Sequence, residues 1–173
     1  MNQSCFDAIA QGELAIECII FASVNSDPGQ ATTDQWWQWI AFTKNGKLAT
    51  SYYDRQYGSD ELTGFSDFSL SGTGDANSTS FGVSRASSGS MPVPTQFPES
   101  NGFSAFWGDY TGLTAADNAY PFWSDTRDPD LFVCADSAGN VTLPPSVCSG
   151  TNTSGATLND QNAYTAALAV PSK

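Results

Sequence analysis

The chain has 173 residues, 40% of them hydrophobic and 13% aromatic, which is enough for one ordinary domain with a buried core. Acidic residues outnumber basic residues by 18 to 6, and the net charge of −12 argues against nucleic acid and anionic membrane surfaces as partners. The chain contains no histidine, which excludes Ser-His-Asp, Cys-His and histidine-metal chemistry within it.

The N-terminal part predicts one buried strand and no targeting segment. Residues 14–24 form a nearly continuous apolar run with β-branched residues at its centre, and a turn sequence follows. Residues 1–23 lack a basic start and are interrupted by acidic residues, unlike a signal peptide. We assign residues 1–30 to the end of a preceding sheet or a flank, and expect any export signal to lie outside this chain.

Residues 31–100 predict one antiparallel sheet followed by a connecting loop. Asn45-Gly46 is the strongest hairpin signal in the chain. A loop rich in Pro and Ser follows the sheet at residues 86–100. The predicted strands are residues 36–42, 48–53, 65–70 and 81–85.

A second unit is predicted over residues 101–150, and residues 151–173 read as a polar tail or a closing strand. The turn at Ala116-Asp117-Asn118 separates two strands of the second unit. In the tail, one strand is expected around residues 164–170. The predicted strands of the second unit are residues 103–114, 119–123 and 131–134.

The two units read as variants of one pattern of strand, turn, strand, acidic residue and arginine. A shift of 71 positions aligns them without a gap. Short strands and frequent turns predict an all-β fold, and blade-like repetition predicts a β-propeller. A β-sandwich is the alternative. The shift superposes Trp36 on Trp107, Trp39 on Tyr110, Tyr52 on Trp123 and Asp54 on Asp125.

The cysteines and the charge predict an extracellular or secreted protein. Cys5 and Cys18 form one close pair in the sequence, and Cys134 and Cys148 form another. Neither spacing is typical of zinc or redox sites, so each pair is interpreted as a disulfide, with free buried thiols as the alternative. No run of about 18 apolar residues is present to span a membrane.

Residues 106–113, Phe-Trp-Gly-Asp-Tyr-Thr-Gly-Leu, and residues 119–127, Ala-Tyr-Pro-Phe-Trp-Ser-Asp-Thr-Arg, resemble the last blades of sialidase-superfamily propellers. These are the BNR-repeat or exo-alpha-sialidase-like proteins. Residues 39–55 look like the preceding blade. The resemblance implies a six-bladed parent, of which this chain supplies about two four-stranded antiparallel blades at the C-terminal end. The remaining blades of the parent are then its partner, with a glycan or glycoprotein as substrate.

The resemblance also implies catalytic roles. Sialidases clamp a sugar carboxylate with three arginines and use a tyrosine nucleophile. Tyr110 matches the nucleophile, and Arg127, Asp109 and Asp125 accompany it as catalytic candidates. The alternative for Tyr110 is a strand aromatic that packs between blades. The alternative for Arg127 is a structural ion pair at a strand end. The substrate-binding candidates are Asp54, Arg55 and Trp107.

No cofactor is expected, with Ca²⁺ as the candidate if one is bound. Clustered carboxylates supply the oxygen ligands that Ca²⁺ prefers, although no EF-hand pattern is present. Exposed aromatic residues offer stacking surfaces for sugar rings, and buried blade aromatics are the alternative. The acidic residues concerned are Asp109, Asp125, Asp128, Asp130 and Asp136. The aromatic residues concerned are Trp36, Trp37, Tyr57 and Trp107.

Two functions follow from these observations. The first is a C-terminal part of a secreted sialidase-like glycoside hydrolase acting on terminal sialic acid or related sugars. The second is a non-catalytic propeller scaffold that binds carbohydrate or protein. Because the chain lacks an intact arginine triad and a Tyr-Glu pair, we expect the isolated chain to be inactive.

Overall fold

The computed structural model describes residues 22–58, 64–75, 78–93, 110–132, 156–159 and 161–173. In these ranges the regular elements are β-strands and one 3-10 helix, and no helix is long and apolar enough to span a membrane. The elements are η2 (Pro28–Thr32), β1 (Gln35–Phe42), β2 (Leu48–Asp54), β3 (Asp67–Thr73), β4 (Phe81–Arg85), β5 (Gly112–Ala115), β6 (Ala119–Asp125), β7 (Pro129–Phe132), β8 (Ala156–Asn159) and β9 (Asn162–Thr165).

The first sheet is a four-stranded antiparallel meander in the order β1-β2-β3-β4. The β1–β2 hairpin turns at Asn45-Gly46, where Gly46 adopts a φ of 78° that suits glycine. The first sheet confirms the predicted antiparallel unit. Its third strand begins at Asp67, so Phe65 lies outside it.

The second sheet is three-stranded, in the order β5-β6-β9. β9 pairs with β6 antiparallel, although β7 and β8 lie between them in the chain and form a separate two-stranded sheet. Two strands of this sheet, β5 and β6, come from the predicted second unit, and the third comes from the predicted tail. The described part of the sheet thus has three strands, where the resemblance implies four. β9 takes the place beside β6 that β3 takes beside β2.

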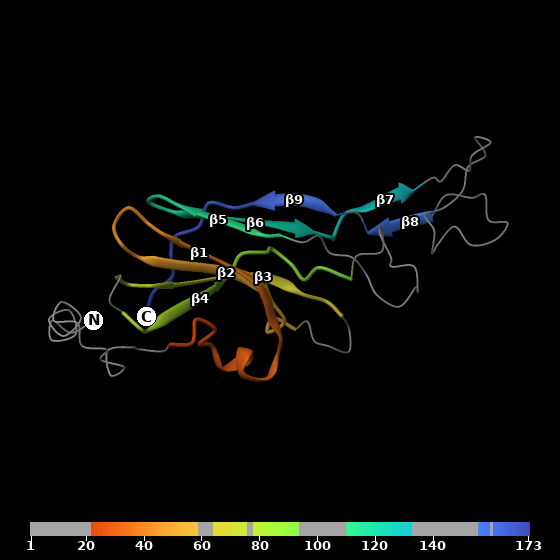
Figure 1. Ribbon diagram of the computed structural model, residues 1–173. Helices are drawn as coiled ribbons and strands as arrows, with labels where there is room; N and C mark the ends of the chain where they lie inside the picture. The colour runs from red at the N-terminus through yellow and green to blue at the C-terminus, as the bar shows by residue number, and fades with distance from the viewer. Residues whose placement is uncertain (1–21, 59–63, 76–77, 94–109, 133–155, 160) are drawn as a thin grey trace, which may run out of the picture.

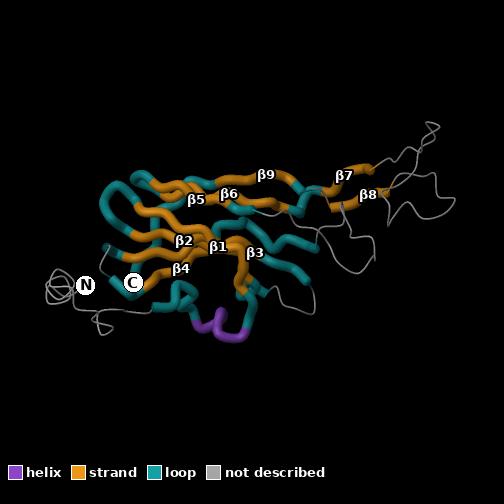
Figure 2. Tube along the Cα trace, in the orientation of Figure 1, coloured by secondary structure: helices purple, strands orange, loops and turns teal. Residues whose placement is uncertain are grey.

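The two larger sheets form adjacent layers, and η2 lies on the other side of the first sheet (Figures 1 and 2). Aromatic rings fill the space between the layers. Phe68 of β3 stacks on Trp123 of β6 with ring centroids 5.2 Å apart. Tyr53 contacts Phe68 edge to face at 4.9 Å, and Met91 completes this buried cluster. The core thus joins the two predicted units.

The C-terminal segment connects both layers. Leu168 forms a bridge with Ala119 of β6, and Ser172 forms a bridge with Phe81 of β4. Between them, Val170 is buried in a cluster with Leu70 and other small apolar residues of both sheets. These residues, predicted as a polar tail or a closing strand, therefore contribute to the core.

Several sequence-based expectations differ from the structure. Residues 22–24 are not in a strand, and the rest of the apolar run at 14–21 lies outside the described residues. β7 begins at Pro129, earlier than predicted, and β9 lies at Asn162–Thr165 instead of around 164–170. Both shifts arise because these strands are defined by distant pairing partners. The four cysteines lie outside the described residues.

Candidate functional site

A buried carboxylate ends the second strand of the first sheet. Asp54 is fully buried and accepts hydrogen bonds from neutral donors on four segments, including Gln35 of β1 at 3.3 Å. The Gln30 side chain donates at 2.6 Å and the Ser69 hydroxyl at 2.7 Å. Gln56 donates its backbone N–H at 3.1 Å and its side-chain amide at 2.9 Å. These bonds satisfy a charge whose burial alone is unfavourable.

A second buried carboxylate ends the second strand of the second sheet. Asp125 is 1% exposed and accepts the backbone N–H of Arg127 at 3.1 Å. The Arg127 guanidinium binds the same carboxylate through Nε at 2.8 Å and through a terminal nitrogen at 2.7 Å. The Trp123 indole N–H donates to it at 3.2 Å. The hydrogen bond to Asp125 raises the pKa of Arg127 above its ordinary value.

Asp54 and Asp125 are equivalent positions under the 71-residue shift, and each accepts the backbone N–H two residues later. The same shift places Gln56 on Arg127. Both of these side chains fold back onto the carboxylate two residues before them. The counterpart of Arg127 in the first unit is therefore Gln56, and not Arg55, which the shared Asp-Arg pattern suggested.

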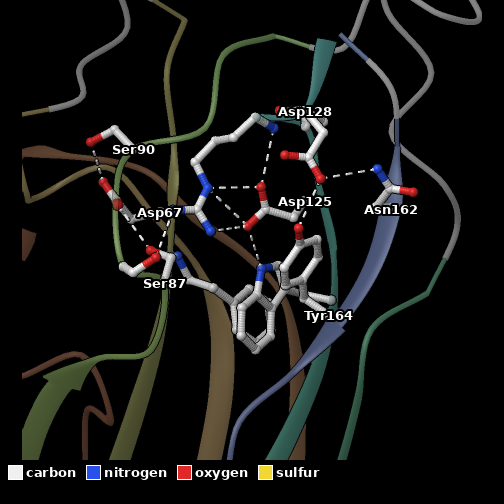
Figure 3. A network of polar contacts seen from close by, with 12 residues as sticks. Asp67, Ser87, Ser90, Asp125, Asp128, Asn162 and Tyr164 are labelled. Atoms are coloured by element: carbon white, nitrogen blue, oxygen red, sulfur yellow. Dashed lines mark hydrogen bonds and ion pairs between the residues drawn. The ribbon is translucent and has the colours of Figure 1, made fainter. Parts of the chain in front are cut away.

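A third buried carboxylate, Asp67, lies opposite Asp54 in the β2–β3 register. The Arg85 Nε donates to it at 2.8 Å, and the Ser87 and Ser90 hydroxyls donate at 2.9 and 3.0 Å. Figure 3 shows Asp67 with its donors Ser87 and Ser90, and Asp125 in the same view. Residues 86–93 connect the two centres, because Ser88 accepts a hydrogen bond from Arg127 at 2.7 Å.

Each arginine of the chain pairs with an aspartate. Arg85 and Arg127 bind buried carboxylates, whereas Arg55 contacts exposed Asp34 at 3.4 Å and lies over the Trp36 ring. Because Arg127 uses most of its donors on Asp125 and Ser88, this geometry is that of a structural ion pair. Each of the three arginines therefore binds a different aspartate.

Tyr110 lies elsewhere, in a shallow hollow between β1 and β5. It is 80% exposed. Trp37 and Trp39 of β1, Gln38 between them and Thr111 form the rest of the described lining. All six basic residues of the chain lie in the described ranges, and none of them belongs to this lining. Tyr110 and Arg127, both predicted as catalytic, are therefore not brought together there.

Burial or a hydrogen bond raises the pKa of four tyrosines around these centres. Burial raises the pKa of Tyr52 and of Tyr53 well above the usual value, and it also raises the pKa of Tyr57. The pKa of Tyr164 is raised because its hydroxyl donates to Asp128 at 2.8 Å. Tyr52 and Tyr53 are thus neutral hydrogen-bonding groups of the core.

The remaining predicted site residues are distributed as follows. Asp109 and Trp107 lie outside the described residues, as does Asp136 of the Ca²⁺ candidates. Asp128 also accepts a hydrogen bond from Asn162 at 3.3 Å (Figure 3). The described residues contain no cluster of three or more His, Cys, Asp or Glu arranged to hold a metal ion. Ca²⁺ binding stays a prediction.

Sequence reasoning missed the three glutamines that donate to Asp54, which are Gln30, Gln35 and Gln56. Gln30 is 2% exposed and bridges Asp54 and the Tyr52 hydroxyl, and Gln56 closes the turn. Extending the repeat alignment two residues beyond Asp54 would have identified Gln56 as the position equivalent to Arg127. No sequence signal distinguished Gln30, because its role depends on how η2 packs against the sheet.

Comparisons with protein-family models, curated proteins and solved structures found no match to this chain. The sialidase-superfamily resemblance therefore rests on its sequence motifs.

Proposed function

We propose that the chain forms two neighbouring blades of a sialidase-superfamily propeller and serves as a non-catalytic, carbohydrate-binding scaffold. The observation that carries this proposal is the equivalence of Asp54 and Asp125. Each is buried at the end of the second strand of its sheet and closes a turn with the backbone N–H two residues later. Two repeat units with one local design favour a repeat architecture over two unrelated sheets.

The orientation of the sheets favours stacked blades rather than a β-sandwich, in which like faces would meet. In the first sheet, Tyr52 points towards Gln30 on the η2 side. Its counterpart in the second sheet, Trp123, points towards Phe68 of the first sheet. Equivalent faces of the two sheets therefore point in the same direction along the stack, as in successive blades of a propeller.

The outer face of the second sheet is consistent with the expected partner. A further blade of a longer parent chain would pack on this face. Tyr120 and Phe122 on this face are 39% and 49% exposed. Their counterparts in the first sheet, Ala49 and Ser51, are fully buried because the second sheet covers that face. A further blade would cover the two aromatic residues in the same way.

The arginines support the proposal of a non-catalytic role. A sialidase needs guanidinium groups free to bind a sugar carboxylate. Here Arg85 and Arg127 bind buried aspartates, and Arg55 lies between Asp34 and Trp36. The chain has no other arginine. The proposed ligand is a glycan. The excess of acidic residues supports a location outside the cell.

The second candidate is a sialidase-type hydrolase in which Tyr110 is the nucleophile. The observation that favours it is the 80% exposure of Tyr110, which leaves the residue accessible to a sugar. In this function the missing arginines and the acid/base come from other blades of the parent.

A hydrolysis assay with a fluorogenic sialoside on the longer parent chain, run beside this chain alone, separates the two candidates. We expect no turnover by the parent or by this chain. Turnover that disappears in Tyr110→Phe and persists in Tyr120→Phe, a control at another exposed tyrosine, would establish the hydrolase and refute the scaffold. Turnover that persists in both variants would refute the scaffold and the nucleophile role together.

A further inference from the structure

The hollow at the seam between β1 and β5 has the features of a small ligand site. Its volume is about 240 Å³, slightly below the roughly 300 Å³ at which pockets for drug-sized ligands begin. The described lining combines Trp37, Gln38 and Trp39 of β1 with Tyr110 and Thr111, which lie directly before β5. The size suits one or two sugar rings.

The chemistry of the lining combines aromatic faces with an amide. Trp37, Trp39 and Tyr110 are 37%, 46% and 80% exposed, so parts of their rings face solvent. An aromatic face packs well against the C–H face of a pyranose ring, and phenol and indole groups add hydrogen bonds at its edge. The Gln38 amide supplies both donors and an acceptor for sugar hydroxyls.

The backbone at Trp37 supports the idea of a specifically built site. Trp37 has a φ of 53°, which is unfavourable for a bulky side chain, and it lies at a bulge in β1 between Trp36 and Trp39. The Thr111 hydroxyl donates to the Trp37 carbonyl at 2.8 Å and fixes this conformation. Strained residues that are held in this way cluster at functional sites.

The charge distribution decides which sugar fits. No Lys or Arg belongs to the described lining, and the chain carries a net charge of −12. An anionic sugar such as sialic acid would therefore meet a repulsive field without a compensating cation. From these observations we propose that the hollow binds a neutral pyranose by stacking on Trp39 and Tyr110. This inference deepens the proposed carbohydrate-binding function and rests on it.

Ligand-observed NMR on the full chain tests the site, with lactose, cellobiose and methyl α-mannoside as neutral probes and N-acetylneuraminic acid as the anionic probe. We expect saturation transfer to at least one neutral probe and none to the anionic one. Trp39→Ala and Tyr110→Ala should each weaken binding about tenfold or more. Tyr110→Phe should retain binding, because the ring remains. Phe42→Ala is the matched control, since Phe42 is 61% exposed on the same strand and outside the hollow.

Three outcomes overturn the inference: no binding of any neutral probe, equal or stronger binding of N-acetylneuraminic acid, or unchanged binding by Trp39→Ala. Circular dichroism and thermal unfolding of each variant confirm that the fold is retained. Failure of sugar binding with both sheets intact would reject the hollow but leave the paired-blade architecture standing. Binding of the anionic probe would instead favour the sialidase-type candidate.

Discussion

The hydroxyl of Tyr53 in β2 donates to the carbonyl of Ser124 in β6 at 2.9 Å and accepts the backbone N–H of the same residue at 3.0 Å. These two residues are equivalent under the 71-residue shift. One side chain of the first unit thus satisfies both backbone groups of its own counterpart in the second. This two-way hydrogen bond fixes how the two sheets are placed along the strand direction.

Tyr53→Phe is expected to lower the free energy of unfolding by about 1–2 kcal/mol, because the Ser124 N–H and C=O both lose their partner. The control Tyr120→Phe removes a hydroxyl from a side chain that is 39% exposed. It should change stability by no more than about 0.5 kcal/mol. Urea unfolding monitored by tryptophan fluorescence measures both. Equal stability of Tyr53→Phe and the wild type would show that the hydroxyl does not hold the sheets together.

Stability should decrease at alkaline pH. Burial raises the pKa of Tyr52 and Tyr53 in the folded protein, whereas tyrosine in an unfolded chain ionises near pH 10. The stabilisation is therefore fully present below about pH 10 and is lost as the pH rises towards the folded-state pKa values. Urea unfolding across this range should show the decrease, and Tyr53→Phe should reduce its slope. Ionisation of all six tyrosines in the folded protein at one ordinary pKa, seen by ultraviolet difference absorbance, would contradict this prediction.

Arg127→Gln should be tolerated better than Arg127→Ala. Glutamine at the equivalent position 56 donates to Asp54 at 2.9 Å, so it can do the same for Asp125. We expect Arg127→Ala to lower the free energy of unfolding by about 2–3 kcal/mol. This is less than the loss expected on breaking a fully buried pair, because the Arg127 side chain is 27% exposed. Arg127→Gln should recover about 1 kcal/mol of this loss. Thermal unfolding measures the difference.

Arg55→Gln is the control for this pair of variants. Arg55 contacts exposed Asp34 at 3.4 Å, so its replacement should cost less than about 1 kcal/mol. If Arg127→Gln is as unstable as Arg127→Ala, the proposed equivalence of positions 56 and 127 is wrong.

Gly82→Ala should detach the C-terminal segment from β4. A Cβ atom at Gly82 would lie 2.7 Å from the backbone nitrogen of Ser172, and backbone cannot move aside as easily as a flexible side chain. We expect a loss of about 1–3 kcal/mol. Gly74→Ala is the matched control, because its Cβ would come no closer than 3.9 Å to Ser172. Increased hydrogen exchange at residues 168–172 in Gly82→Ala alone would confirm the prediction, and equal protection in both variants would refute it.

The first sheet was largely predictable because its signals are local. Short strand segments and the Asn45-Gly46 turn depend only on neighbouring residues, and β1, β2 and β4 lie close to where these signals place them. The repeat alignment also identified Asp54 and Asp125 as matching positions. It did not reveal that both carboxylates are buried structural centres, because burial depends on the layers above and below them.

The amino-acid sequence by itself determined an all-β chain, the hairpins and the 71-residue correspondence between its two units. Only the tertiary structure decided that β9 pairs with β6, that Gln30 reaches Asp54, and that Val170 packs between the sheets. Local backbone preferences act over a few residues and leave their mark in the sequence pattern. The partners of a strand edge or a buried carboxylate depend on which distant segments meet, and that choice is made by the packing of the whole chain.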